Sequence, residues 1–341
     1  MSTVLGTLRR IALTPSFARV SFRGRRFPVT ETAATRRLEA IPQAVVCGFE
    51  WGVEARTQQE VEQRLSLVEP ELRGFAFEGA AMAYTVRDAM AAGRGHRTRD
   101  LLMGPGRPHI FLTYIGIGFA MARLPRPLWK KVMPDLTGSP YYPTMTWFAV
   151  DGYGFDRAYF ATRKWVHRQK VPKPYPWAGS PDYFRRAFDH GVGRALWFIH
   201  GGRPAEVVAA VRRFHASRQA DLWSGVGLAA TFAGGSAPEE LSVLLAEAGE
   251  FRADVSLGAV LAAKGRDHSG HVPDHTRAAA AALAGMSVEL AVDLADRTEV
   301  AFDTPGPVPP YELWRQRIRA HFTGPTDQAA DSPGLQTASD I

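Results

Sequence analysis

The chain has 341 residues, of which 45% are hydrophobic and 22% are charged, and Cys47 is its one cysteine. These values are typical of a globular protein with a sizeable core, and they exclude a mainly disordered chain, an intrachain disulfide and a cysteine-based zinc site. The net charge of +7 comes almost entirely from residues 1–40, where eight arginines outnumber two glutamates.

Residues 1–40 are predicted to form a basic N-terminal arm with little fixed structure. Such an arm can contact an acidic partner, a membrane surface or nucleic acid, and a solvated basic terminus is the simpler alternative. No nucleic-acid-binding motif accompanies the arginines, so we expect no nucleic-acid partner. No segment has the roughly 18 apolar residues of a membrane span or the pattern of a secretion signal, which predicts a cytoplasmic protein.

Residues 41–322 are predicted to form one helical repeat domain. Its N-terminal half covers residues 41–170 and begins with an apolar segment, 41–53, that fits either a strand or an irregular core segment. Its C-terminal half covers residues 182–300 and follows a proline-rich linker. Residues 323–341 are small and polar, which predicts a disordered tail.

A repeat of about 34 residues is the strongest pattern in the chain. The segments 189–198 and 223–232 align without a gap, with Gly191 and Gly225 34 residues apart, and a further unit follows after 33 residues. Each unit is predicted to contain a helix with closely spaced small residues, a glycine turn and a proline that begins a second helix. The sequence therefore predicts a mainly α fold of stacked two-helix repeats, similar to an α-solenoid, and leaves open whether the stack is extended or compact.

The recurring Gly-x-Gly pairs have two interpretations. A dinucleotide-binding turn needs a preceding strand and an acidic residue about 20 positions later, and neither accompanies the copies. Glycines and alanines on one helix face also let a neighbouring helix approach closely, and this packing role fits a motif that recurs along the chain. No other nucleotide or cofactor motif is present, so we expect no cofactor.

The richest polar cluster on a predicted helix consists of Asp189, His190 and Arg194. A histidine beside a carboxylate is a plausible pair for proton transfer. Arg194 lies four residues after His190, on the same helix face, and its guanidinium can stabilise an anionic oxygen. We predict these three as catalytic residues, with an exposed capping network as the alternative.

A second group is predicted to line a substrate pocket, because tryptophans suit a planar, unsaturated ligand and nearby polar groups can orient it. The alternative is that these aromatic residues belong to the core, as aromatic residues at helical spacing usually do. The predicted pocket residues are Trp147, Asp151, Asp156, Tyr159, Trp165, Trp197, His200 and Trp223.

The segment 267–275 contains three histidines and two aspartates, a density that can bind a metal. Gly270 and Pro273 interrupt any continuous helix face there, and Asp274 or Thr276 can instead cap the helix that follows. We therefore expect no metal site.

Three segments of the chain resemble a bacterial family of proteins encoded beside the iterative polyketide synthases of enediyne antibiotics. They are VDGYGFDRAYF (150–160), RRAFDHGVGRALWFIHGG (185–202) and ADLWSGVGLAATFAGG (220–235). The resemblance extends over roughly residues 40–300. It implies a role in enediyne biosynthesis, and it implies no particular catalytic residues.

Two functions of different classes follow. The first is a cofactor-independent enzyme that cyclises a hydrophobic polyketide or enediyne intermediate, or couples it to an aromatic partner, by proton transfer. The second is a non-catalytic helical-repeat protein that binds an acyl carrier domain of the polyketide synthase or sequesters a reactive intermediate. Removal of residues 1–40 is expected to abolish the second function and largely to spare the first.

Overall fold

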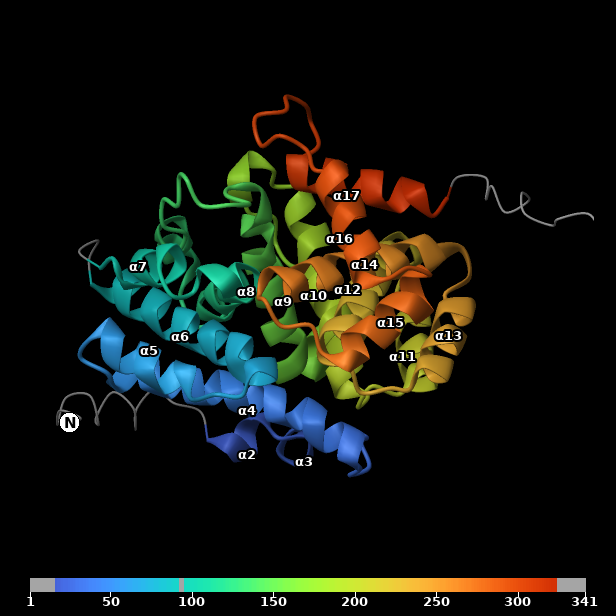
Figure 1. The fold of residues 1–341 in the computed structure, drawn as a ribbon, viewed down its shortest axis with the longest axis horizontal. Helices are drawn as coiled ribbons and strands as arrows, with labels where there is room; N and C mark the ends of the chain where they lie inside the picture. The colour runs from blue at the N-terminus through green and yellow to red at the C-terminus, as the bar shows by residue number, and fades with distance from the viewer. Residues whose placement is uncertain (1–15, 92–94, 324–341) are drawn as a thin grey trace, which may run out of the picture.

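The computed structural model describes residues 16–91 and 95–323, and over these ranges the chain is helical and contains no strand. The prediction of a mainly α, helical-repeat fold is confirmed. Seven long helices follow one another in a single row, each packed on the next in chain order (Figure 1). They are α4 (Ala33–Glu54), α6 (Pro70–Met90), α8 (Ile110–Met121), α9 (Trp147–Phe160), α10 (Tyr183–Ile199), α12 (Ala216–Ala233) and α14 (Arg252–His268).

Shorter helices flank the row. Within the C-terminal half, α11 and α13 are the second helices of two repeat units, and prolines stand in the first turn of each, as the repeat predicted. The short helices are α2 (Phe17–Val20), α3 (Phe22–Arg25), α5 (Gln58–Ser66), α7 (Arg97–Met103), α11 (Pro204–Arg212), α13 (Pro238–Glu247), α15 (Asp274–Ala284), α16 (Val288–Arg297) and α17 (Pro310–His321).

Glycines bring the backbones of neighbouring long helices into direct contact. A Cβ atom added to Gly193 of α10 would lie 2.8 Å from the carbonyl carbon of Leu222 in α12, and one added to Gly225 of α12 would lie 3.0 Å from that of His190. The same reciprocal arrangement joins α9 to α10 through Gly154 and Gly191. The Gly-x-Gly pairs are therefore helix-packing sites, and they fix how far each helix slides and rotates against the next.

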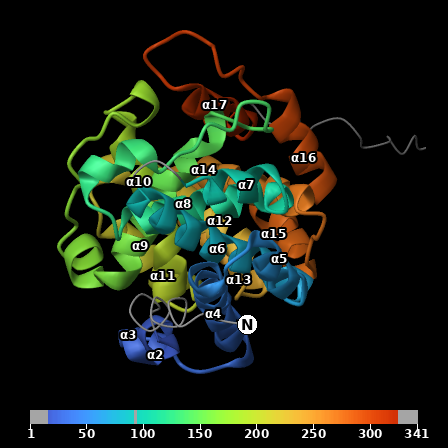
Figure 2. The same ribbon diagram turned by 90° about the vertical axis from the view of Figure 1, so that its left-hand side faces the viewer.

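The row of helices curves until its two ends approach each other. The ring of Phe75 in α6 packs edge-on against Phe232 in α12, with 5.6 Å between the ring centres. Arg266 of α14 donates a hydrogen bond to the backbone carbonyl of Glu71 in α6. The end-on view shows α6, α8 and α12 near the centre of the molecule (Figure 2). The stack is therefore compact, and the inner faces of early and late helices meet.

The N-terminal region differs from the sequence-based expectation. Residues 1–15 lie outside the described part of the chain, but residues 16–40 contain α2, α3 and the first two turns of α4, and they bury Val20, Phe22 and Leu38. Residues 41–53 are neither a strand nor irregular, because they continue α4. Phe27 of this segment packs edge-on against Tyr159 of α9. The arginine-rich composition concealed the few apolar residues that hold the segment in place. Of the predicted tail, residues 324–341 lie outside the described residues.

The glycine contacts lead to a test of the fold. Gly193→Ala should lower the free energy of unfolding by about 1–3 kcal/mol, because the added methyl group meets the backbone of α12. In an isolated helix, replacing glycine by alanine stabilises the helix by about 1 kcal/mol. A loss of stability in this variant would therefore come from the contact with α12. Urea denaturation measures it.

Gly265→Ala in α14 is the matched control. The three atoms nearest to a Cβ there, outside its own helix backbone, are ring carbons of Phe232 and Phe111, the closest at 3.3 and 3.4 Å. Equal stabilities of the two variants would contradict the packing role assigned to Gly193.

Candidate functional site

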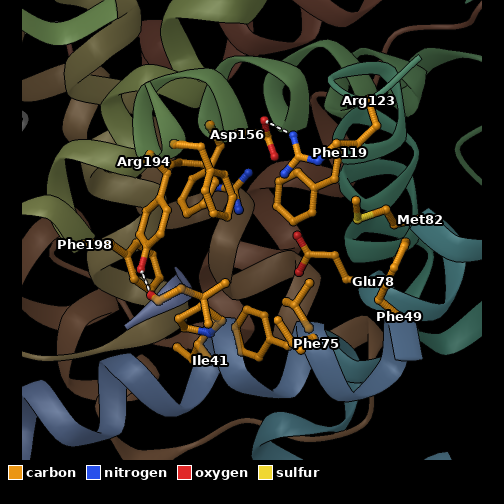
Figure 3. A pocket seen from close by; sticks show the side chains of 17 residues that line it. Ile41, Phe49, Phe75, Glu78, Met82, Phe119, Arg123, Asp156, Arg194 and Phe198 are labelled. Atoms are coloured by element: carbon orange, nitrogen blue, oxygen red, sulfur yellow. Dashed lines mark hydrogen bonds and ion pairs between the residues drawn. The ribbon is translucent and has the colours of Figure 1, made fainter. Parts of the chain in front are cut away.

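The inner faces of α4, α6, α8, α9 and α10 line a partly open cavity of about 660 Å³ (Figure 3). Most of its lining is apolar and aromatic, and among its described lining residues only Glu78, Arg123, Asp156 and Arg194 carry ionisable acid or base groups other than a phenol. An apolar cavity with a few polar groups is the usual form of a small-molecule site. We call it the inner cavity.

The repeat places equivalent residues on the inner cavity. In four helices, the Gly-x-Gly motif, or Gly-x-Ala in α6, is followed directly by a residue that lines the cavity. These residues are Met82 in α6, Phe119 in α8, Phe155 in α9 and Arg194 in α10. The equivalent residues of α12 and α14 are leucines that line a second, adjoining cavity. Arg194 is therefore the charged member of a series that is otherwise apolar, which indicates a role other than packing.

Arg194 is held by a buried carboxylate. Its Nη1 donates to Oδ1 of Asp151 in α9, while Nδ1 of His190 bonds to Oδ2 of the same carboxylate. All three side chains are buried. The guanidinium of Arg194 lies 5.2 Å from the ring centre of Phe155, so it reaches the cavity wall. Asp151 and His190 lie behind the wall and orient Arg194.

The charges of this trio follow from its contacts. Burial on its own raises the pKa of Asp151, but Arg194 and His190 overcome this effect and hold that pKa below its ordinary value. Burial lowers the pKa of His190 against the attraction of Asp151. The trio is therefore an ionised aspartate, a charged arginine and a neutral imidazole, and its net charge is close to zero.

Glu78 of α6 faces the cavity from the side opposite α10 (Figure 3). Its side chain is 2% exposed, and burial raises the pKa of its carboxyl to about 8, against an opposing attraction from Arg194. No ion pair of Glu78 is found within residues 16–91 and 95–323. A carboxyl with this pKa carries its proton at neutral pH and can donate it to a bound molecule.

Asp156 of α9 and Arg123, just beyond α8, form a second ion pair on the cavity wall, with 2.8 Å between Oδ1 and Nη1. Burial raises the pKa of Asp156 even though Arg123 lowers it. Arg123 also lies 5.1 Å from the ring centre of Phe160. Asp156 and Tyr159, both predicted from the sequence, thus line the cavity, and the Tyr159 hydroxyl donates to the backbone carbonyl of Val20.

The predicted pair of Asp189 with His190 is not formed. Both oxygens of Asp189 accept hydrogen bonds from Arg218, at 2.5 and 2.8 Å, and His190 pairs with Asp151 instead. Consecutive residues of a helix project about 100° apart, so Asp189 and His190 face different neighbours. His190 and Arg194, four residues apart, do share a face and meet at Asp151.

The four predicted tryptophans lie in the helix packing and do not line the inner cavity. Trp147 packs on Tyr183, Trp165 packs on Phe188, and the Trp197 indole donates to the carbonyl of Gly234. Trp223 is buried as well. These positions match the alternative interpretation as core residues. His200 lies elsewhere, in a surface hollow beside α9 and α11, where burial lowers its pKa to about 4.

Sequence reasoning did not identify Glu78 and Arg123 as site residues. A signal for Glu78 is present: it directly precedes the first glycine of its motif, as Asp151 and His190 do in theirs. The position before the first glycine faces the interior in the other repeats. A charged residue there, within the apolar segment 75–83, is therefore expected to face the interior as well. Arg123 follows the last turn of α8 and has no such marker.

No group of three or more metal-binding side chains was found within residues 16–91 and 95–323. In the histidine-rich segment, His275 instead bonds to the carbonyl of Phe232. No single helix of the described ranges is both long and apolar enough to cross a membrane, although α15 and α16, bent by 64° at their junction, pass as a pair by length and composition.

The family model described as "Protein of unknown function (DUF1702)" matches residues 4–322, so the chain belongs to that family. Curated proteins and solved structures gave no match.

The buried trio leads to a stability test. Asp151→Asn should lower the free energy of unfolding by about 3–5 kcal/mol, because Arg194 stays buried without its counter-charge. Glu31→Gln is the control: Glu31 pairs with Arg36 at 3.1 Å, but its side chain is 77% exposed, and such pairs contribute about 0–1 kcal/mol. Urea titrations that place both variants within 1 kcal/mol of each other would refute the assignment.

The pKa of Glu78 leads to a pH-dependent test. The unfolded chain ionises this group near its ordinary pKa of 4.5, whereas the folded protein keeps the proton up to about pH 8. Ionisation therefore favours the unfolded state increasingly between these two pH values, and the penalty is complete above pH 8. Glu78→Gln removes it, so the variant should gain in Tm relative to wild type as pH rises from 4.5 to 8. A Tm difference that is constant over this range would contradict the raised pKa.

Proposed function

We propose that this protein is an enzyme of enediyne biosynthesis that acts on a hydrophobic polyketide intermediate in the inner cavity, by cyclisation or by coupling to an aromatic partner. The observation that carries the proposal is the Glu78 carboxyl, which is buried, faces an apolar cavity and has a pKa of about 8. The packing of α6 does not require an acid there, because the equivalent residues of α8 and α14 are Ile115 and Leu257. The resemblance of residues 150–160, 185–202 and 220–235 to proteins encoded beside enediyne synthases supports the pathway.

The proposed chemistry uses Glu78 as the proton donor. A polyene or polyketide chain in the cavity accepts the proton at one atom, and the Glu78 carboxylate then removes a proton from another atom as the new bond forms. The cyclisation is an isomerisation and the coupling is an addition of one molecule to the other, so in both cases the acid is regenerated and no electrons are gained or lost. Proton transfer of this kind needs no redox cofactor.

Arg194 is proposed to stabilise negative charge that develops on a substrate oxygen. Its guanidinium is fixed by Asp151 before substrate binds, so little reorganisation is needed. One of its nitrogens, Nε, is buried without a protein partner in the described structure. The Phe49, Phe75 and Phe119 rings line the cavity around both groups and are proposed to hold an apolar chain.

The second candidate is a binding protein of the bacterial cytoplasm that partners the polyketide synthase or sequesters a reactive intermediate. Residues 16–40 do not form a separate arm, because Val20 lines the inner cavity and α4 begins at Ala33. Removing residues 1–40 would damage the cavity itself and impair either function. Turnover, rather than truncation, separates the two candidates.

Deletion of the gene in a producing strain, followed by mass spectrometry, tests the proposal. An intermediate should accumulate, and wild type and the control Glu31→Gln should clear it, whereas Glu78→Gln should not. Glutamine retains the shape of glutamate but has no acidic proton to donate. Equal clearance by Glu78→Gln and wild type would show that Glu78 is not the acid and would favour the binding protein.

The purified protein gives a further readout. With the accumulated intermediate as substrate, kcat/KM should fall as the pH rises through about 8, because Glu78 of the free protein loses the proton that it donates. Arg194→Ala should lower kcat/KM and move the fall to a higher pH, because Glu78 remains but loses the attraction that lowers its pKa. A rate that rises through pH 8 would instead indicate that the ionised carboxylate starts the reaction, which contradicts the proposed order of proton transfers.

A further inference from the structure

A basic surface hollow lies next to the inner cavity. It lies between the N-terminal segment, the end of α9, η4 (Arg163–His167) and the ends of α10 and α11, and it has a volume of about 1210 Å³. Its cationic lining residues are Arg25, Arg26, Arg163, Lys164 and Arg213. We call it the basic hollow.

The positive charge of the basic hollow is largely uncompensated within the described structure. Glu206 is the one carboxylate among its described lining residues, and its nearest ion-pair partner is Arg203, at 3.8 Å, outside the lining. The five cationic residues form no ion pair within residues 16–91 and 95–323. Five cations around one concave surface attract an anion, and guanidinium groups suit the oxygens of a phosphate.

Phe160 connects the basic hollow to the inner cavity, because its side chain lines both. Its ring centre lies 5.3 Å from the guanidinium of Arg25 in the hollow and 5.1 Å from that of Arg123 on the cavity wall. Arg25 also donates hydrogen bonds to the backbone carbonyls of Tyr159 and Phe160, at 3.1 and 2.7 Å, which fixes the guanidinium at this boundary.

Apolar space continues on the other side of the inner cavity. The second cavity shares Phe75, Arg194 and Phe198 with it and is lined by residues of α6, α8, α9, α10, α12 and α14. The order of sites is therefore the basic hollow, the inner cavity with Glu78, and an apolar extension. Only a ligand with an anionic group at one end and a long apolar chain would match all three.

We propose that the basic hollow is an anion site that binds a phosphate ester at the head of an apolar chain, while the chain occupies the inner cavity. This inference rests on the proposed function and adds the substrate class. The phosphate ester has two possible sources, the phosphopantetheine arm of a carrier domain and a free phosphorylated thioester. In both cases the phosphate fixes which atoms of the chain lie beside Glu78.

A pair of chemically matched probes tests the anion site. Octanoyl-phosphopantetheine and octanoyl-pantetheine differ by the phosphate alone, and calorimetry with the full chain gives the Kd of each. The phosphate should strengthen binding about tenfold or more, and the gain should shrink as salt is added. Equal Kd values for the two probes, or no binding of either, would overturn the proposal.

Charge-removing variants locate the effect. The double variant Arg163→Ala, Arg213→Ala should lose most of the phosphate gain, and both side chains are exposed, so the fold should persist. The control Arg99→Ala, Arg185→Ala removes the same charge, from exposed positions in α7 and at the opposite end of α10, and should keep the gain. An equal loss in both double variants would show a general charge effect and overturn the site.

Two further measurements distinguish a carrier-bound phosphate from a free ester, and the anion site from the proposed function. Tighter binding of the octanoyl group on a carrier domain than of free octanoyl-phosphopantetheine would assign the phosphate to a carrier arm, and weaker binding would assign it to a free ester. Glu78→Gln should leave the phosphate gain unchanged. If the gain is absent while clearance of the intermediate still depends on Glu78, the anion site fails and the proposed function stands.

Discussion

Direct backbone contact between neighbouring helices is the constraint on which the rest of this structure depends. At each crossing of the long row, a glycine of one helix lies against a peptide group of the other. At most crossings the contact is reciprocal, as with Gly191 and Gly154 between α9 and α10, whereas between α6 and α8 the partner of Gly116 is Ala81. A side chain at either position would push the helices apart. Because the contacts are reciprocal, they fix the register as well as the distance, and the same positions of each motif point inward throughout the row.

The fixed register explains where the polar groups lie. The residue before the first glycine is Glu78, Asp151 or His190 in three helices and an apolar residue or serine in the others. Asp151 and His190 are compensated by each other and by Arg194, so their burial is electrostatically balanced. Glu78 has no such partner in the described structure and avoids the cost of a buried charge by keeping its proton. A fold selected for stability alone would place leucine or isoleucine there.

The sequence predicts the repeat, the second-helix prolines and the helical class, because these are local patterns of spacing. It fails for residues 16–40, where six arginines outnumber the buried residues, and for residues 41–53, where Pro42 falls inside α4. At the site it identifies Arg194, Asp151, Asp156 and Tyr159, whose neighbours lie in the same motif or the next. The approach of Glu78 to Arg194 joins helices more than 100 residues apart. This approach results from the curvature of the whole row of helices, and the spacing of residues in the sequence does not reveal that curvature.

The curvature of the row also makes the two ends of the interior different in polarity. If the row were straight, α6 would not meet α12, and the inner faces would form an open groove that water fills. The contact of Phe75 with Phe232 instead narrows the interior to two adjoining apolar spaces, with Arg194 and Phe198 lining both. The N-terminal segment covers the other end, where Arg25 holds the last residues of α9 and brings positive charge to the boundary. The interior thus changes from cationic at one end to apolar at the other, with its one protonated carboxyl between them. A symmetric apolar ligand gains nothing from that gradient, whereas a chain with one charged end binds in a single orientation and always presents the same atoms to Glu78.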